Sequence, residues 1–161
     1  SQMNKIYLLT GSNMGNCRLQ LKKAISIIEK KIGKVSRQSG LYQTAAWGKT
    51  DQPDFLNQVL IVETNLTAEQ TMQAILSIEK QMGRVRTEKN APRIIDIDIL
   101  FFGKEVVLTE NLVIPHPAIQ YRRFVLVPLN ELSPNFIHPV LHESNHHLLL
   151  KCPDKLDVKK K

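Results

Sequence analysis

The sequence predicts an α+β fold, and three observations support that prediction. Short segments rich in β-branched and aromatic residues are typical of strands. Two other segments carry apolar residues at every third or fourth position, as on one face of an α-helix. The segments follow one another in the order β-α-β-β-α-β. This order predicts a ferredoxin-like antiparallel sheet with the helices on one face, followed by C-terminal additions.

Length and composition are those of one domain. The chain has 161 residues, of which 42% are hydrophobic, so a single domain over 1–161 with a core at about 4–140 is expected. Residues 150–161 are expected to form a polar tail. The net charge of +7 suits anionic ligands such as nucleotides or nucleic acid. Two cysteines form no disulfide framework, which favours the cytoplasm, and no signal peptide or membrane-spanning apolar run is visible.

The first half contains three predicted strands, at residues 5–10, 34–46 and 55–64. After the first strand, G-S-N-M-G-N predicts a tight turn into a helix. A phosphate-binding loop would need G-K-[ST] at its end, and Cys17-Arg18 does not supply it, so a structural turn is favoured. The helix has apolar residues at helical spacing, namely Leu21, Ile25, Ile28 and Ile32.

The second helix begins at Thr67, where Thr67 and Gln70 fit a capping box, and it ends at Gly83. A polar, basic loop over 84–92 follows, which is a natural lid over phosphates. Beyond the next strand, a short strand at 105–108 and a helix over 121–132 are expected, with Pro128 bending that helix or lying near its first turn.

The strand at 94–102 is the most informative segment. Alternation places Asp96 and Asp98 on one face, with Cα atoms about 6.6 Å apart, and the apolar residues on the other face. Two carboxylates this close repel each other unless they are protonated or bridged by a cation. The residues expected on the opposite face are Ile95, Ile97, Ile99 and Phe101.

Arginines surround this strand. Arg93 precedes Asp96 by three residues, and Arg84 and Arg86 lie upstream with Lys89. One guanidinium group can bind two phosphate oxygens at once. Mg²⁺ is held by one or two carboxylates together with substrate phosphates. The segment therefore favours a phosphate and metal site over the alternative of an edge strand whose charges face water.

Residues 89–100, K-N-A-P-R-I-I-D-I-D-I-L, resemble the signature of the 6-hydroxymethyl-7,8-dihydropterin pyrophosphokinases. The resemblance extends from about Ile6 to Pro139 through G-S-N, D-Q-P-D-F-L-N, G-R-V-R and P-H. It implies transfer of pyrophosphate from ATP to the pterin in folate biosynthesis, with two Mg²⁺ ions and ATP as co-substrate. We expect small-molecule substrates with no nucleic-acid or membrane partner, and a monomer, with an oligomer as the open alternative.

The resemblance also implies roles for individual residues. Catalytic positions are Arg84, Arg93, Asp96 and Asp98, and the two aspartates are the metal ligands. Pterin-binding positions are Thr44, Ala45, Trp47, Phe55, Asn57 and Phe124, where aromatic rings stack on the heterocycle and the amide binds its edge. ATP-binding positions are Glu79, Arg86, Lys89, Arg93, Ile99, His116 and Arg122.

Two other functions are alternatives to pyrophosphate transfer: RNA binding without catalysis, and transfer of a single phosphate. A non-enzymatic RNA-binding module would use the net charge, but two carboxylates on the sheet face would repel a phosphate backbone without a metal. An ordinary kinase would release ADP instead of AMP. The C-terminal His138, His142, His146, His147 and Cys152 fit no zinc spacing, so an exposed polar segment is expected there.

Overall fold

The structure is a computed structural model that describes every residue except 1–2, 47–50 and 86–90. Its strands and helices, in chain order, are β1 (Asn4–Ser12), α1 (Cys17–Lys31), β2 (Gly33–Gln38), β3 (Tyr42–Thr44), β4 (Phe55–Thr64), α2 (Ala68–Gln81), β5 (Asp96–Phe102), β6 (Val107–Leu108), β7 (Val113–Ile114), the 3-10 turn η1 (Ile119–Tyr121), α3 (Arg123–Leu132), α4 (Asn145–Leu150) and β8 (Lys159–Lys160).

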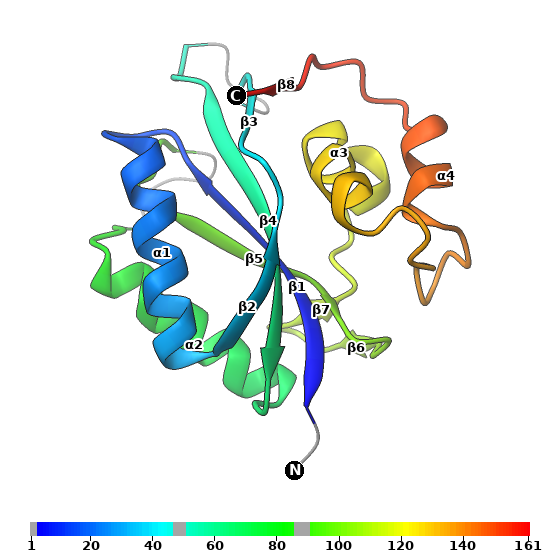
Figure 1. Ribbon diagram of the computed structural model, residues 1–161, viewed down its shortest axis with the longest axis horizontal. Coiled ribbons are helices and arrows are strands. Elements are labelled where there is room, and N and C mark those ends of the chain that lie inside the picture. The colour runs from blue at the N-terminus through cyan, green and yellow to red at the C-terminus, as the bar shows by residue number, and fades with distance from the viewer. Residues whose placement is uncertain (1–2, 47–50, 86–90) are drawn as a thin grey trace.

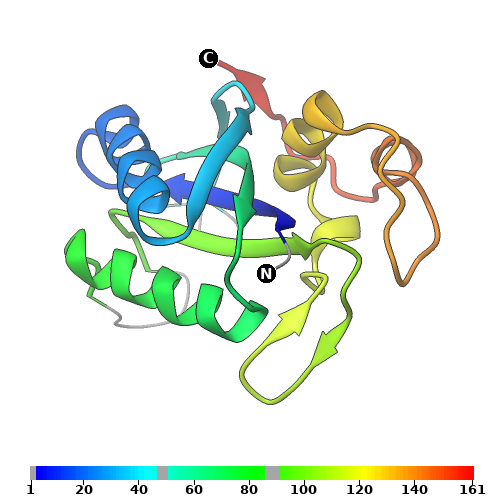
Figure 2. The same ribbon diagram turned by 60° about the horizontal axis from the view of Figure 1, so that its bottom comes forward.

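One antiparallel sheet organises the molecule. Its strands lie in the order β5-β1-β4-β3-β8, and β2 also pairs with β4. Figure 1 shows α1 and α2 against one face of this sheet, and α3 and α4 beyond the other; Figure 2 shows the same layers from a second direction. The prediction of an antiparallel sheet with helices is confirmed.

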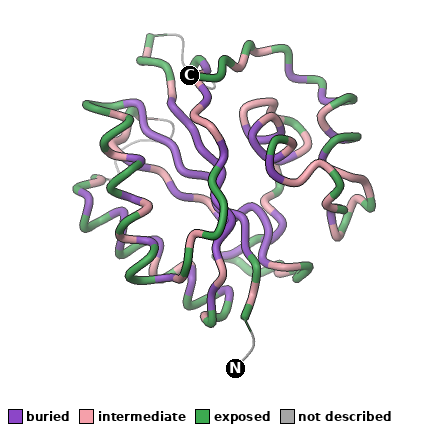
Figure 3. Tube along the Cα trace, viewed as in Figure 1, coloured by how far each residue is buried: buried purple, intermediate pink, exposed green. Residues whose placement is uncertain are grey.

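Each face of the sheet has its own hydrophobic core, and Figure 3 shows the strands buried between the two layers. On the α1 and α2 side, Ile6 and Leu8 of β1 pack with Ile28 and Ile75. On the α3 side the core contains Tyr7, Val59, Phe101, Val125 and Leu129. The alternation along β1 thus supplies both cores, as the two-residue period of a strand requires.

Local sequence explains where the first two helices begin. The side chain of Asn16 accepts a hydrogen bond from Leu19 N at 3.1 Å. Thr67 and Gln70 form the predicted capping box, with reciprocal bonds of 3.1 and 2.9 Å. These bonds satisfy amide groups that the first helical turn leaves without partners.

The prediction that Phe101 shares a face with Ile95, Ile97 and Ile99 is wrong. Where β5 pairs with β1, Leu8 lies opposite Ile99 and Tyr7 lies opposite Phe101, so β5 contains an extra residue at Leu100. Such a bulge reverses the alternation beyond it. Phe101 consequently joins the core under α3, and its ring lies 5.7 Å from that of Tyr7.

The single strand predicted over 34–46 is also wrong, because it breaks into β2 and β3. Between them Ser39 turns its polar groups to β4: its Oγ accepts from Val59 N at 3.0 Å, and its carbonyl accepts from Gln58 Nε2 at 2.8 Å. The helix predicted over 121–132 is η1 followed by α3, with Pro128 inside α3.

The exposed C-terminal segment predicted from its histidines is only partly correct. His142, His146 and His147 are exposed, but His138 and Cys152 are buried. The His138 ring accepts hydrogen bonds from Val140 N and Leu141 N at 3.1 and 3.0 Å, which makes it part of a turn. The expected tail over 150–161 runs back to the sheet, where β8 pairs with β3.

Candidate active site

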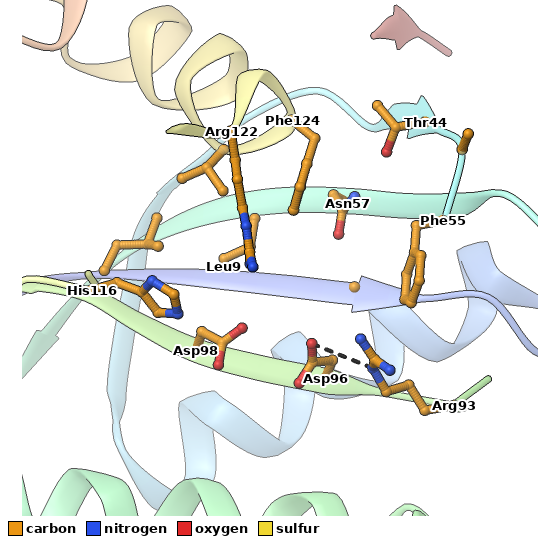
Figure 4. A pocket seen from close by; sticks show the side chains of 14 residues that line it. Leu9, Thr44, Phe55, Asn57, Arg93, Asp96, Asp98, His116, Arg122 and Phe124 are labelled. Carbon is orange, nitrogen blue, oxygen red and sulfur yellow. Dashed lines mark ion pairs between the residues drawn. The ribbon is translucent and has the colours of Figure 1, made fainter. Parts of the chain in front are cut away.

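A pocket opens on the α3 side of the sheet (Figure 4), with about 690 Å³ of empty space when the open solvent at its mouth is included. Strands β1, β4 and β5 form its floor, and the beginning of α3 forms one side. The lining residues are Leu9, Gly11, Thr44, Ala45, Phe55, Asn57, Arg93, Asp96, Asp98, Leu100, His116, Arg122, Phe124 and Val125.

Strand register explains how amide and carboxylate come to share this floor. Gly11 of β1 pairs with Asn57 of β4 on one side and with Asp96 of β5 on the other. Neighbouring strands lie about 4.8 Å apart, so the amide and the carboxylate stand roughly two strand spacings apart across a residue without a side chain. A Cβ at Gly11 would lie 2.4 Å from Asn57 Oδ1. Glycine therefore keeps the middle of the pocket open.

Two aromatic rings flank the amide. Phe55 begins β4, two residues before Asn57, so both point to the same face. Figure 4 shows Phe124, which lies in the first turn of α3, on the other side of Asn57. Thr44 and Ala45, at the end of β3, complete this part of the pocket. A flat heterocycle fits between two such rings, with its edge toward the amide.

The opposite part of the pocket is charged. Arg84 Nη1 donates to Asp96 Oδ1 at 2.8 Å, and Arg93 Nε lies 3.5 Å from Asp96 Oδ2. Arg84 also donates to Glu79 Oε2 at 3.0 Å, and that same oxygen accepts from Ile97 N at 2.8 Å. The buried Glu79 therefore holds Arg84 against β5 from beneath the sheet.

Arg93 also contacts the aromatic part of the site. Its Cζ lies 4.9 Å from the ring centroid of Phe55, a cation–π distance, and its Nη1 donates to Ala91 O at 2.7 Å. One guanidinium thus touches both an aspartate and the ring beside Asn57. The charged side and the aromatic side of the pocket meet at Arg93.

The surroundings of the second aspartate, Asp98, disfavour its charged form. Burial, followed by repulsion from Asp96 and Glu79, raises the pKa of the Asp98 carboxyl group, and attraction to Arg84 and Arg93 lowers it less. The two arginines therefore do not fully offset the burial of Asp98 and its repulsion from the neighbouring carboxylates. An all-oxygen donor pair of this kind fits a hard divalent cation whose remaining ligands are substrate and water oxygens.

Within the described ranges, no group of three or more His, Cys, Asp or Glu side chains is placed to hold a metal ion. Mg²⁺ is usually held by one or two carboxylates together with substrate phosphates, and Asp96 and Asp98 are two carboxylates that line this pocket.

His116 lies beside Asp98 in Figure 4 because its backbone N donates to Leu100 O of β5 at 3.0 Å. Burial, with a contribution from Arg122, lowers the pKa of the imidazole, so the ring is neutral at pH 7. Its Nδ1 accepts from Ala118 N at 3.1 Å. The neutral ring therefore carries its proton on Nε2, which makes that atom a donor.

Asn13 is a residue that the sequence analysis missed. Its Oδ1 accepts from Arg93 N at 2.8 Å, and its Nδ2 donates to Gln52 Oε1 at 3.0 Å and Pro53 O at 3.3 Å. One buried amide thus ties the segment carrying Arg93 to the segment preceding Phe55. The G-S-N pattern indicated only a turn, because neither the burial of Asn13 nor its partners on distant segments can be read from the local sequence.

Most of the predicted site residues come together, but three of the described ones do not line the pocket. Glu79 is buried beneath the sheet, and Ile99 points into the core under α1 and α2. Arg84 lies behind the pocket wall and reaches the site through its ion pair with Asp96. Trp47, Arg86 and Lys89 lie outside the described residues.

Comparison with known proteins agrees with this geometry. A family model described as 7,8-dihydro-6-hydroxymethylpterin-pyrophosphokinase (HPPK) matches residues 7–134. A 2-amino-4-hydroxy-6-hydroxymethyldihydropteridine pyrophosphokinase of Aquifex aeolicus is 40% identical over 138 residues, which cover 86% of each chain. The enzyme of the same name from Methylorubrum extorquens is 40% identical over 136 residues, 84% of this chain and 86% of that one.

Larger proteins match as well. The folic acid synthesis protein fol1 of Schizosaccharomyces pombe is 41% identical over 157 residues, 96% of this chain but 21% of that protein. The chain spans about a fifth of the length of the folic acid synthesis proteins that it matches. A crystal structure of wild-type Plasmodium falciparum HPPK-DHPS has a TM-score of 0.79 at 21% identity, covering 93% of this chain and 43% of that one, which supports the fold alone.

The matched region contains the pocket floor, both aspartates, the arginines and the aromatic residues. On this evidence the chain belongs to the family of the 7,8-dihydro-6-hydroxymethylpterin-pyrophosphokinases.

Proposed function

We propose that the protein transfers the β,γ-pyrophosphoryl group of ATP to the hydroxymethyl oxygen of 6-hydroxymethyl-7,8-dihydropterin, in a Mg²⁺-dependent reaction that releases AMP. The observation that supports this best is the row Asn57, Gly11 and Asp96, which places an amide suited to a heterocycle opposite a carboxylate suited to a metal phosphate. The strand order β5-β1-β4-β2 and the intervening helices also support a ferredoxin-like topology.

The pterin is expected between Phe55 and Phe124, with the Asn57 amide at its edge. Stacking on two rings buries both faces of the heterocycle, and the amide supplies one acceptor and two donors. This fixes the heterocycle in its plane and directs its hydroxymethyl group across Gly11 toward β5. Thr44 and Ala45 are expected to bind through their backbone groups.

The triphosphate is expected over β5, among Arg84, Arg93, His116 and Arg122. Guanidinium groups neutralise charge on the transferred group, and His116 Nε2 donates a hydrogen bond to a phosphate oxygen. Asp96 and Asp98 would hold two Mg²⁺ ions, which supply charge neutralisation and orient the phosphate oxygens. We also propose that nucleotide binding involves Arg86, Lys89, Glu79 and the backbone of Ile99.

The reaction forms a bond between the hydroxymethyl oxygen and the β-phosphorus and breaks the bond from that phosphorus to the oxygen shared with the α-phosphate. AMP leaves, and the hydroxyl proton must be accepted. Within the described part of the pocket, Asp98 is the carboxylate that is not engaged in an ion pair with an arginine. We therefore propose Asp98 as the acceptor of that proton.

The test is chromatography of nucleotides after incubation with ATP, Mg²⁺ and the reduced pterin. AMP that appears only when the pterin is present supports the proposal. ADP would instead indicate an ordinary kinase. Absence of any product, with folded protein and reduced pterin, would overturn the proposed function and leave the family membership as a statement about fold.

The remaining expectations concern cell location and assembly. Cys17 and Cys152 are both free thiols, which suits a reducing compartment, and we propose a cytoplasmic monomer that does not bind nucleic acid. None of the described helices has both the length and the apolar composition needed to span a bilayer.

A further inference from the structure

The C-terminal segment, residues 151–161, connects two parts of the pocket. It leaves α4, passes the beginning of α3 and ends beside β3, as the path from α4 to β8 in Figure 1 shows. The first turn of α3 contributes Arg122, Phe124 and Val125 to the pocket, and the end of β3 contributes Thr44. One segment of chain therefore contacts the elements on both sides of the proposed pterin site.

Its main contact with α3 is made by Asp154. This side chain is buried, with 8% of the residue exposed, and its Oδ2 accepts from Arg123 N at 2.9 Å. The other oxygen, Oδ1, accepts from Leu156 N at 2.9 Å, which fixes the carboxylate relative to its own backbone. Both oxygens are thus engaged, and the carboxylate bridges the C-terminal segment to the first residue of the helix.

The helix has no cap of its own at this position. Its N-cap residue is Arg122, in an extended conformation and without a side-chain hydrogen bond to the first turn. The first amides of a helix need acceptors, and the positive end of the helix dipole disfavours cations such as Arg122 and Arg123. The Asp154 carboxylate supplies both an acceptor and a negative charge from a distant part of the chain.

We propose that Asp154 is a positioning residue for the reaction, an inference that rests on the proposed function. By capping α3 from the C-terminal segment, it fixes the first turn and so holds Arg122 and Phe124 where they line the pocket. Arg122 is the residue before the capped amide and Phe124 the residue after it, so a shift of the Arg123 backbone moves both side chains.

The far end of the segment is anchored independently. Tyr42 pairs with Lys160 in the β3 and β8 ladder, and Lys160 Nζ lies 3.6 Å from Glu131 Oε1 near the end of α3. Tyr42 also donates its hydroxyl to that oxygen at 2.5 Å. Since these contacts do not involve Asp154, a change at Asp154 can loosen the first turn of α3 while β8 stays paired.

The experiment compares Asp154→Ala and Asp154→Asn with a control, Asp157→Ala. The control removes a carboxylate from the same segment, but Asp157 is exposed and its Oδ2 lies 3.9 Å from Lys159 Nζ, a weak surface ion pair. Asparagine keeps one side-chain oxygen, which can accept from Arg123 N or from Leu156 N but not from both, because its Nδ2 is a donor, and it removes the negative charge. Hydrogen exchange of backbone amides by NMR and steady-state kinetics are measured for all three variants and for the parent chain.

In Asp154→Ala the Arg123 amide should exchange about 2- to 30-fold faster, the range equivalent to the 0.5–2 kcal/mol that a side-chain cap contributes. The KM values for ATP and for the pterin should rise by a similar factor. Asp154→Asn should recover part of both effects, because its one oxygen can still accept from Arg123 N, and Asp157→Ala should show neither. A purely structural role would lower the active fraction, and hence the apparent kcat, without a change in KM.

Unchanged exchange at Arg123, or KM values equal to those of Asp157→Ala, would overturn the proposal. If the parent chain makes no AMP, the proposed function fails by itself, and exchange at Arg123 together with the ring resonances of Phe124 still decides the position of the first turn. In that case Phe124 resonances that are identical in Asp154→Ala and the parent chain would refute the role of Asp154.

Discussion

Gly11→Ala is the substitution that tests the geometry of the pocket most directly. The new Cβ would lie 2.4 Å from Asn57 Oδ1 and 3.7 Å from Phe55 Cδ1, so the Asn57 amide must rotate away from its present position. Loss of its hydrogen bonds to a bound heterocycle should cost about 1–3 kcal/mol, which is roughly a 5- to 150-fold loss in affinity for the pterin. Stability should stay the same or fall slightly, because displacing the buried Asn57 amide costs about 1–3 kcal/mol, of which the preference for alanine over glycine in a strand offsets only about 0.5–1 kcal/mol.

The assay is titration of the reduced pterin against Gly11→Ala, Asn57→Ala and the double variant, with urea unfolding of each. If the steric contact with Asn57 is the cause, Gly11→Ala should have little further effect once Asn57 is alanine, so the two losses should be strongly non-additive. Additive losses, or a Gly11→Ala variant that binds the pterin as well as the parent chain, would refute the reasoning.

Three further predictions follow from other contacts. Asp96→Asn and Asp98→Asn should each lower turnover with Mg²⁺ and ATP by about 100-fold or more, and near-normal rates in either would exclude a catalytic metal at that residue. Asn13→Ala removes the bonds to Arg93 N and Gln52, and should raise the KM for both substrates by about 10-fold, which steady-state kinetics would measure. Tyr42→Phe should destabilise the protein by about 1 kcal/mol in urea unfolding at pH 7, because it loses the bond to Glu131. Burial raises the pKa of Glu131, but bonding to Tyr42 and neighbouring groups outweighs burial and lowers that pKa. The stability contributed by the bond is therefore present above the ordinary carboxyl pKa and should vanish as the pH falls through the pKa of Glu131 in the folded protein. An equal difference in stability between Tyr42→Phe and the parent chain at pH 7 and pH 3 would contradict this prediction.

The sequence was sufficient for the parts of the site that depend on strand alternation. Asp96 and Asp98 lie on one face of β5, and Phe55 and Asn57 on one face of β4, because a two-residue period is a local property. It was also sufficient for the capping box of α2, which involves residues three apart. Family resemblance then identified Phe124, His116 and Arg122, which no local pattern connects with β5.

The remaining features depend on contacts between distant segments. Asn13 acquires its role from Arg93 and Gln52, and Asp154 from Arg123, and none of these partners can be read from the local sequence. The break between β2 and β3 depends on Ser39 bonding to β4. Strand alternation alone predicts that the Ile99 side chain lies beneath the sheet, where the structure has it, whereas the family resemblance implies that Ile99 contacts the nucleotide.

The bulge at Leu100 divides β5 into two halves with opposite phase. Before it, odd-numbered residues pack under α1 and α2 while the aspartates face the pocket; after it, Phe101 packs under α3 and Phe102 under the other helices. A residue inserted after the bulge would change which core receives each aromatic ring, whereas the same insertion before Asp96 would turn both carboxylates into a hydrophobic core. The site therefore depends on the phase of the first half of β5, and the packing of the aromatic rings depends on the phase of the second half.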